Sequence, residues 1–382
     1  MKKIVLVCNT SWGMMMFREG LMRCLVKEGH KVYVLAPKDN HSDDVVKLGC
    51  NYIEVSMDNK GSNIFKDLFL LRRLYKQYKE IKPDLIFHYT IKPNIYGTLA
   101  AYYVGVKSIA VITGLGYTFI NQNITAKIAK YLYKVSLKKS QKVWFINHED
   151  RKKFIKERLL SRDLMEILPS EGVDMVKYSP REKRIDDDVF RFILIARLLW
   201  DKGVGELVLA TKEIKKKYKN VEVQLVGFVD VKNPQAILKT QIDEWVSKGL
   251  VNYLGSTDDV RDFIGDADCV VLPSYREGVS KILLEAASMA KPIIASNVPG
   301  CRDIVEHASS GYLCRVKDPK DLQMKMQMML SLNDYELYEM GRRGREHIKR
   351  EFNEEIVIKK YLKTIEFYTC GYKHKSFVLK KD

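Results

Sequence analysis

Two glutamates flank a turn in the stretch SYREGVSKILLEA, residues 274–286. An apolar run before the turn predicts a buried strand, and the run after it predicts a helix. Gly278 permits a tight turn or a close ligand approach, and Ser280 can cap a helix whose first N–H groups bind an anion. Because a carboxylate repels an isolated phosphate, Glu277 and Glu285 favour a ligand with hydroxyls beside its anion, as in a nucleotide sugar. The alternative interpretation is that Glu277 interacts with the dipole at the helix N-terminus and that Glu285 is a solvated helix residue.

A second pair of charges follows another apolar run, in ILIARLLWDKGV at 193–204. Arg197 comes directly after the predicted strand, and Lys202 stands just before Gly203 and a predicted helix. A forked guanidinium and a compact ammonium at a strand-to-helix turn suit a diphosphate. Two solvated surface cations are the alternative. Both motifs follow strands of one predicted domain, so each supports the other.

Short apolar runs alternate with helical patterns along most of the chain. The predicted strands are 3–8, 31–36, 51–56, 84–88, 108–113, 142–147 and 164–169, then 190–196, 221–227, 251–255, 269–273, 292–296 and 312–316. Helical patterns include 14–28, 64–79 and 94–104. Such alternation predicts βαβ units and parallel sheets covered on both faces.

The chain divides into two α/β domains. A polar, charged stretch at about 175–190 indicates a linker, so we expect domains at 1–175 and 190–352. The helix predicted at about 353–372 is expected to pack back on the first domain. Two doubly wound domains bind ligands at the carboxyl ends of their strands.

These motifs resemble the retaining glycosyltransferases of family 4. The resemblance spans nearly the whole chain and rests on RLLWDKGV, LPSYREGVSKILLEA and the segment LPSEGVDMVKYSP. It implies the GT-B fold, which is α/β with two Rossmann-like doubly wound parallel-sheet domains facing a central cleft. SWGMMMFRE (11–19), HYTIKPNIYG (88–97) and TGLGYTF (113–119) look like the branch that builds O-antigen, capsule, lipopolysaccharide and protein-linked glycans on a polyprenyl diphosphate.

The resemblance assigns roles by position. It implies that Arg197 and Lys202 stabilise the departing diphosphate, that Glu277 contacts donor-sugar hydroxyls and that Glu285 accepts hydrogen bonds from the ribose. We therefore expect Glu277, Arg197 and Lys202 to be catalytic. The expected donor-binding residues are Gly13, Gly255, Ser256, Gly278, Val279, Ser280 and Glu285.

The acceptor side departs from the family pattern. Many members carry a histidine in the loop that here reads TGLGYTF, which has none. His88 is the nearest candidate, with Lys92 and Asn94 after it, although a histidine at a strand end is often structural. Arg18, in the first helix, is a candidate for an acceptor diphosphate.

The composition bounds the partners and the location. The net charge of +17 favours an anionic partner. AKIAKYLYKVSLKK, at 126–139, has five lysines, no acid and an apolar stripe; it fits either an anionic membrane surface or a core-packed helix with a solvated lysine face. The seven scattered cysteines and a first apolar run too short for a signal peptide favour a cytoplasmic protein, peripheral on the inner face of the plasma membrane.

No cofactor and no metal are expected. The acidic runs DAD (266–268) and DDD (186–188) imitate metal motifs, but the first precedes a buried strand and the second falls in the linker. Glycines and polar residues interrupt the weakly charged stretch 94–126, which disfavours a membrane span.

The sequence therefore predicts a retaining, metal-independent hexosyltransferase. It would move a sugar, an N-acetylhexosamine or a related one, from a UDP-sugar to a polyprenyl-diphosphate-linked glycan. A nucleotide-sugar 2-epimerase of the same fold and a basic nucleic-acid-binding protein are the alternatives, although no recognised nucleic-acid module is present. No G-x-G-x-x-G follows the first strand, which disfavours a dehydrogenase. Whether the base is uracil or guanine stays open.

Overall fold

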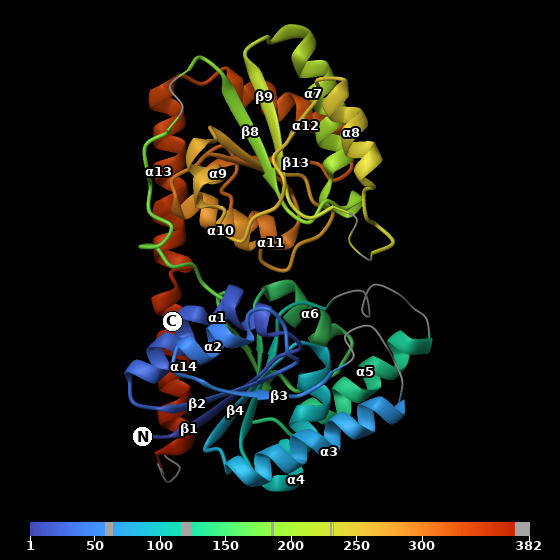
Figure 1. The fold of residues 1–382 in the computed structure, drawn as a ribbon, viewed down its shortest axis with the longest axis vertical. Helices are drawn as coiled ribbons and strands as arrows, with labels where there is room; N and C mark the ends of the chain where they lie inside the picture. The colour runs from blue at the N-terminus through green and yellow to red at the C-terminus, as the bar shows by residue number, and fades with distance from the viewer. Residues whose placement is uncertain (58–63, 116–123, 185–186, 230, 232, 371–382) are drawn as a thin grey trace. The chain divides into compact units, whose positions relative to one another are not determined.

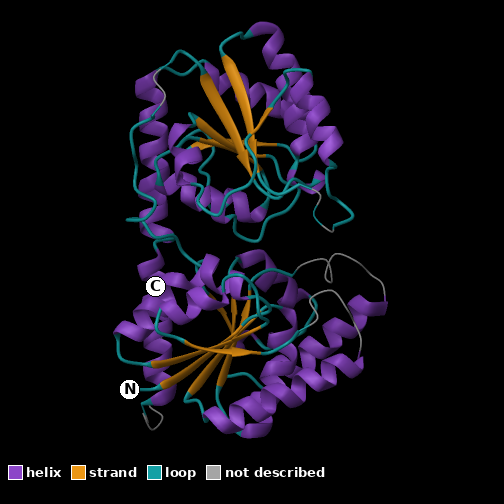
Figure 2. Cartoon of the chain, in the orientation of Figure 1, coloured by secondary structure: helices purple, strands orange, loops and turns teal. Residues whose placement is uncertain are grey.

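The protein forms two compact units (Figure 1). The structure is a computed structural model that describes residues 1–57, 64–115, 124–184, 187–229, 231 and 233–370. The N-terminal unit comprises Met1–Glu171 together with the chain from Glu354 onward, and the C-terminal unit comprises Gly172–Asn353. Each unit is a parallel sheet with helices on both faces (Figure 2).

The sheet of the N-terminal unit has the order β3-β2-β1-β4-β5-β6-β7, with every pair parallel. Its strands are β1 Lys3–Val7, β2 Lys31–Ala36, β3 Asn51–Glu54, β4 Leu85–Tyr89, β5 Ser108–Ile112, β6 Lys142–Phe145 and β7 Met165–Ile167. All seven were predicted, with small differences at their ends. Chain order reverses between β1 and β4, so ligands are expected at the carboxyl ends of these two strands.

Helices cover both faces of this sheet. They are α1 Ser11–Lys27, α2 Ser42–Lys47, α3 Ile64–Ile81, the π-helix η1 Pro93–Gly97, α4 Thr98–Val104, α5 Ile124–Leu137, α6 His148–Lys156, the 3₁₀ turn η3 Arg162–Leu164 and α14 Glu354–Thr369. α3, α4 and α5 pack on one face, through two hydrophobic clusters that include Val5, Ile86 and Phe145. On the other face, Tyr361 of α14 packs against Phe87 and Trp144.

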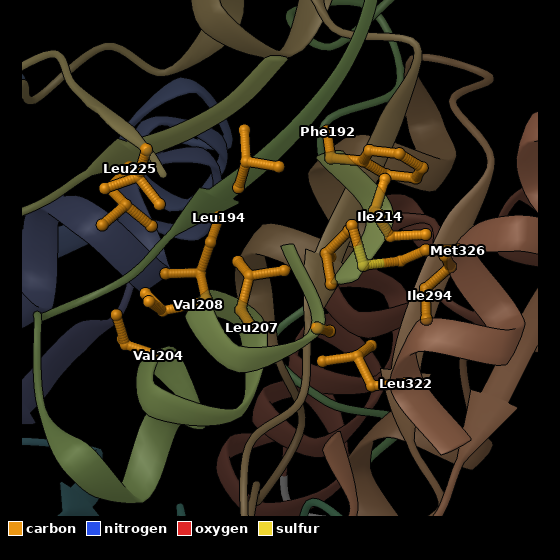
Figure 3. Close-up of a cluster of buried hydrophobic side chains, with 14 of the residues drawn as sticks. Phe192, Leu194, Val204, Leu207, Val208, Ile214, Leu225, Ile294, Leu322 and Met326 are labelled. Carbon is orange, nitrogen blue, oxygen red and sulfur yellow. The ribbon is translucent and has the colours of Figure 1, made fainter. Parts of the chain in front are cut away.

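The C-terminal sheet has the order β10-β9-β8-β11-β12-β13 and is also parallel. Its strands are β8 Phe190–Ile195, β9 Val221–Val226, β10 Asn252–Tyr253, β11 Cys269–Leu272, β12 Ile293–Ser296 and β13 Gly311–Cys314. The helices are the 3₁₀ turn η4 Trp200–Lys202, α7 Val204–Lys217, α8 Lys239–Ser247, α9 Arg261–Asp266, α10 Lys281–Ser288, α11 Pro299–Arg302, α12 Pro319–Leu330 and α13 Asp334–Glu351. On one face, side chains of β8 such as Leu194 pack against Leu207 of α7, and Met326 of α12 belongs to the same cluster (Figure 3).

Ion pairs hold the segment predicted as a linker against α9 and against the residue that precedes β11. Lys183 pairs with Asp268 at 3.0 Å, and the Arg184 guanidinium contacts Asp266 at 2.6 Å and Asp262 at 2.8 Å. The acidic run DAD thus has cationic partners. In the second run Asp187 pairs with Arg191, while Asp186 lies outside the described residues. No group of three or more His, Cys, Asp or Glu within the described ranges could hold a metal ion. In the same ranges, no helix is long and apolar enough to cross a membrane.

Candidate active site

The two charged motifs meet at the reversal point of the C-terminal sheet. β8 and β11 are neighbours there, with β9 on the other side of β8. Arg197 lies two residues past the end of β8, and Glu277 lies in the loop between β11 and α10. In open parallel sheets this position is where ligands bind.

Backbone contacts join the two motif loops into one structure. Tyr275 donates its N–H to the carbonyl oxygen of Asp201 at 2.9 Å, and the Ser274 hydroxyl donates to the same oxygen at 3.3 Å. Gly203 has a φ of +75°, and a Cβ there would lie 2.1 Å from the carbonyl oxygen of Pro273. Only glycine fits this left-handed position against a neighbouring backbone. These contacts therefore fix the loop that carries Lys202 against the loop that carries Glu277.

The side chains of the two motifs are not equally accessible to a ligand. Lys202 Nζ lies 2.6 Å from Glu277 Oε1, and both side chains are largely buried. The Arg197 side chain is exposed and has no ion-pair partner among the residues that the structure describes. The loop thus presents one open guanidinium beside an ammonium–carboxylate pair.

Glu285 is a buried acceptor in α10. It is 4 % exposed, so the alternative of a solvated helix residue is wrong. Lys281 Nζ lies 3.1 Å from its Oε1. Burial, together with the charge of Glu285 and a hydrogen bond to it, raises the pKa of Tyr178. The Tyr178 hydroxyl therefore stays protonated and donates to Glu285, which fixes the orientation of the carboxylate.

The turn between Glu277 and α10 rests on α11. Ser280 is the N-cap residue of α10, but its hydroxyl makes no capping hydrogen bond, contrary to the expectation. Its backbone N–H donates to Gly300 at 3.4 Å. A Cβ at Gly300 would lie 2.2 Å from the carbonyl oxygen of Gly278, and Val279 packs against a core cluster. Gly300 was not predicted to take part in the site, although the Pro299–Gly300 dipeptide is a turn signal in the sequence.

Gly255 and Ser256 lie at the same edge of the sheet. Gly227 donates its N–H to the carbonyl oxygen of Gly255 at 2.8 Å. A Cβ at Gly227 would lie 1.7 Å from the carbonyl oxygen of Ala196, next to Arg197. Gly227 therefore connects the strand end that carries Arg197 with the Gly255 loop. The glycine at the end of the predicted strand 221–227 is the signal from which this contact could have been predicted.

In the N-terminal unit, Arg18 is committed to internal partners. It is 4 % exposed, forms an ion pair with Glu171 and donates to the carbonyl oxygen of Gly13 at 3.3 Å. Its Cζ lies 3.7 Å from the centroid of the Tyr89 ring. Burial lowers the pKa of Arg18, but the charges of Glu171 and of the neighbouring Tyr89, Cys8 and Tyr361 together outweigh burial, so that the pKa is raised. Gly13 is also buried, and its N–H donates to the Thr10 hydroxyl at 3.0 Å.

The remaining acceptor candidates hold parts of the N-terminal unit together. His88 is fully buried, with Nε2 2.9 Å from the Tyr78 hydroxyl oxygen, and burial lowers its pKa to about 3. Asn94 donates to the carbonyl oxygen of Val111 at 2.9 Å. Lys92 Nζ lies 2.6 Å from Asp67 Oδ1. This environment matches the structural alternative for His88. From Gly116 on, the loop TGLGYTF lies outside the described residues.

Comparisons with known proteins address both units. A family model described as "Glycosyl transferase 4-like" matches residues 3–147, and one described as "Glycosyl transferases group 1" matches residues 177–347. The N,N'-diacetylbacillosaminyl-diphospho-undecaprenol alpha-1,3-N-acetylgalactosaminyltransferase of Campylobacter jejuni is 29 % identical over 363 residues, which cover 91 % of this chain and 94 % of that protein. The UDP-Gal:alpha-D-GlcNAc-diphosphoundecaprenol alpha-1,3-galactosyltransferase of Escherichia coli is 26 % identical over 276 residues, 68 % of this chain and 69 % of that one.

Solved structures agree on the fold. A glycosyltransferase from Rickettsia africae superposes with a TM-score of 0.82 at 17 % identity and covers 97 % of this chain and 99 % of its own. HepE of Anabaena in complex with UDP-glucose gives a TM-score of 0.78 at 16 % identity, with 96 % and 100 % covered. The predicted GT-B fold is confirmed, and these matches give no support to an epimerase or a nucleic-acid-binding protein. The chain belongs to the glycosyltransferases that combine a 4-like N-terminal domain with a group 1 C-terminal domain.

Proposed function

We propose that this glycosyltransferase moves an N-acetylhexosamine, or a related sugar, from a UDP-sugar to a polyprenyl-diphosphate-linked glycan, with retention and without a metal. The observation that carries the donor half is the open Arg197 guanidinium beside the Lys202–Glu277 pair at the reversal point of the C-terminal sheet. The printed names of the two relatives, which specify diphosphoundecaprenol-linked acceptors, support the acceptor half.

The cations act on the leaving group. The bond between the anomeric carbon and the phosphate oxygen breaks with its electron pair on that oxygen, and Arg197 and Lys202 stabilise the charge. The acceptor hydroxyl oxygen bonds to the anomeric carbon on the same face, and its proton passes to the departing phosphate. Glu277 accepts hydrogen bonds from donor-sugar hydroxyls, and Glu285, oriented by Tyr178, accepts them from the ribose.

The ion pair between Lys202 and Glu277 gives the site two states. Without ligand, each group compensates the charge of the other at 2.6 Å. An arriving diphosphate competes for Lys202 and leaves the Glu277 carboxylate for the sugar hydroxyls. Glu277→Gln therefore has opposite effects on the two halves of the ligand, because it frees Lys202 for phosphate and weakens the sugar contact.

The remaining assignments concern the donor loop and the acceptor. Gly13, Gly255, Ser256 and the turn Gly278–Ser280 stay proposed donor contacts. Arg18 serves an acceptor diphosphate only when Glu171 releases it, and Lys92 does so only when Asp67 does. For His88 and Asn94, we propose a positioning role in place of direct acceptor contact.

The proposed location is the inner face of the plasma membrane. Lys127, Lys134, Lys138 and Lys139 are exposed in and just after α5. They provide positive charge for an anionic membrane surface.

The test begins with the donor. UDP and GDP are titrated calorimetrically in excess EDTA against wild type, Lys202→Ala and Glu277→Gln. We expect UDP to bind, to weaken roughly tenfold in Lys202→Ala and to bind several-fold more tightly in Glu277→Gln. Failure of both nucleotides to bind would remove the donor assignment, and GDP binding alone would redirect the donor search.

Transfer is then measured from radiolabelled UDP-N-acetylhexosamines to a polyprenyl-diphosphate disaccharide. Product whose linkage has the donor's anomeric configuration is the expected result. A lower rate in Glu277→Gln, in spite of its tighter UDP binding, separates the sugar contact from the phosphate contact. Equal transfer by wild type and Glu277→Gln contradicts the role of Glu277.

A further inference from the structure

The helix α3 exposes an apolar stripe that no donor or acceptor role uses. Its residues Leu70, Leu74 and Tyr78 are buried against the sheet. On the outward side, Phe65 is 76 % exposed, and Leu68 and Phe69 are 61 % and 63 % exposed. Large apolar side chains that recur at helical spacing on an exposed face indicate a surface covered by something other than water.

The stripe continues into a groove between α3 and α4. The groove has a volume of about 730 Å³ and is lined by Phe65, Leu68, Phe69, Leu71, Arg72, Tyr75 and Tyr103. Tyr103, on α4, is 64 % exposed. The lining thus combines apolar side chains with two tyrosines and one arginine. Tyrosine and arginine side chains can pack their apolar parts against hydrocarbon while their polar ends stay in water.

The neighbouring helix α5 extends this face. α4 contacts both α3 and α5, and the three helices lie on the same side of the sheet (Figure 1). Tyr131 of α5 is 67 % exposed, and Ile128 is also exposed, whereas Tyr133 and Leu137 are buried. The ammonium group of Lys139 lies 4.3 Å from the centroid of the Tyr102 ring of α4, which joins the end of α5 to α4.

The charges around the apolar side chains are almost all positive. The exposed cations on the α3–α4–α5 face are Lys66, Arg72, Arg73, Lys76, Lys79, Lys127, Lys134, Lys138 and Lys139. Of the acids in the same helices, Asp67 is buried against Lys92 and Glu80 lies 3.8 Å from Lys76. A second copy placed symmetrically on this face would meet the same excess of positive charge. An anionic lipid headgroup layer has the complementary charge.

We propose that the α3–α4–α5 face docks on an anionic bilayer, with Phe65, Leu68, Phe69 and Tyr103 inserted at the level of the acyl chains. The cations contact the headgroups, as in helices that lie in the membrane interface. This docking surface rests on the proposed function and extends it, because it is the surface that brings the N-terminal unit to a lipid-linked acceptor.

The test measures partition of the full chain onto vesicles of phosphatidylcholine with roughly one quarter phosphatidylglycerol, and onto phosphatidylcholine alone. Phe65→Ser/Phe69→Ser removes the aromatic stripe, and Arg72→Glu/Lys76→Glu reverses the charge beside it. Tyr335→Ser/Tyr338→Ser, on the exposed face of α13, is the matched control. We expect both groove variants to lower partition onto anionic vesicles by about tenfold or more, with the control unchanged and wild type binding neutral vesicles weakly.

Separate readouts distinguish this proposal from the donor assignment. UDP binding in solution, without vesicles, is expected to be the same in wild type and all three variants. Transfer to a vesicle-embedded acceptor is expected to fall in the groove variants, while transfer to a short-chain, water-soluble analogue does not. Wild-type partition by Phe65→Ser/Phe69→Ser would overturn the docking surface. So would a wild-type dimer in solution that this variant dissociates, because the face would then bind a second copy.

Discussion

The two units share one topology but use the charges at their reversal points differently. In the C-terminal unit, Arg197 is exposed, and the partner of Lys202 is a glutamate that itself has a proposed ligand. In the N-terminal unit, Arg18 is buried, ion-paired with Glu171 and stacked on Tyr89. A cation near the reversal point of a parallel sheet is therefore available to a ligand in one unit and stabilises the fold in the other. Burial and the identity of the partner decide between these uses.

The largest expected effect is on stability, from Glu171→Ala. It leaves the Arg18 guanidinium buried without its carboxylate, which costs about 3–5 kcal/mol when one partner of a buried pair is removed. Urea unfolding, with hydrogen exchange of α1 and β4 amides to localise the loss to the N-terminal unit, measures it.

Glu277→Ala is the matched control, because the Lys202 side chain lies closer to solvent than the Arg18 side chain and water can better solvate its charge once the carboxylate is removed. We therefore expect a smaller loss there than in Glu171→Ala. If Glu171→Ala is as stable as wild type, Arg18 reaches solvent easily and is as available to a ligand as Arg197, and the contrast between the units disappears.

The next effect is on catalysis, from Arg197→Ala. Removing a donor that stabilises developing charge costs about 100- to 1000-fold in kcat. Stability should change by less than about 0.5 kcal/mol, because the side chain is exposed. The measurement is kcat for sugar transfer beside a urea unfolding curve, with Arg350→Ala on α13 as the control. Unchanged turnover in Arg197→Ala would mean that exposure at a strand end is not evidence of a ligand site here.

The pH dependence of stability tests the buried character of His88. Its pKa is about 3 in the folded protein, against an ordinary value of 6.5, because it is fully buried. Between these values the unfolded chain binds the proton and the folded one does not, so stability is present above pH 6.5 and is lost as the pH falls. The loss is about 1.4 kcal/mol per pH unit, or about 2 kcal/mol between pH 6.5 and 5.

The difference between wild type and His88→Gln isolates this contribution. Urea unfolding at pH 7.5, 6.5 and 5 is expected to show the extra loss in wild type alone. Parallel pH profiles for the two proteins would indicate a histidine that stays solvated, and would return His88 to the acceptor candidates.

The sequence predicted the strands and the motif positions well, because both depend on local patterns. Continuous apolar runs predicted the parallel strands, and the two motifs predicted loops that the structure joins through Lys202 and Glu277. The surroundings of single residues could not be predicted. The His88 ring contacts the hydroxyl groups of Tyr78, in α3, and Thr98, in α4. Whether a strand residue faces such helices or a ligand depends on how the helices pack, which the local sequence does not show. The contact between Tyr178, in the segment predicted as a linker, and Glu285 could not be predicted either, because the two residues are distant in sequence and only the fold brings them together.

The smallest expected effect compares two lysines that each pair with a motif glutamate. Lys202 lies in the loop after β8 and is proposed to meet the diphosphate, whereas Lys281 pairs with Glu285 one helical turn away on α10 and is more exposed. An i,i+4 pair of this kind contributes about 0.3–0.5 kcal/mol. Lys281→Ala should therefore lower stability by no more than that and change turnover less than about threefold, against roughly tenfold weaker UDP binding in Lys202→Ala. Parallel titrations of UDP against both variants make the comparison. Because both variants remove the same charge, a large loss in Lys281→Ala would show that the site responds to the net charge around α10, and not to the place of one ammonium group at the end of β8.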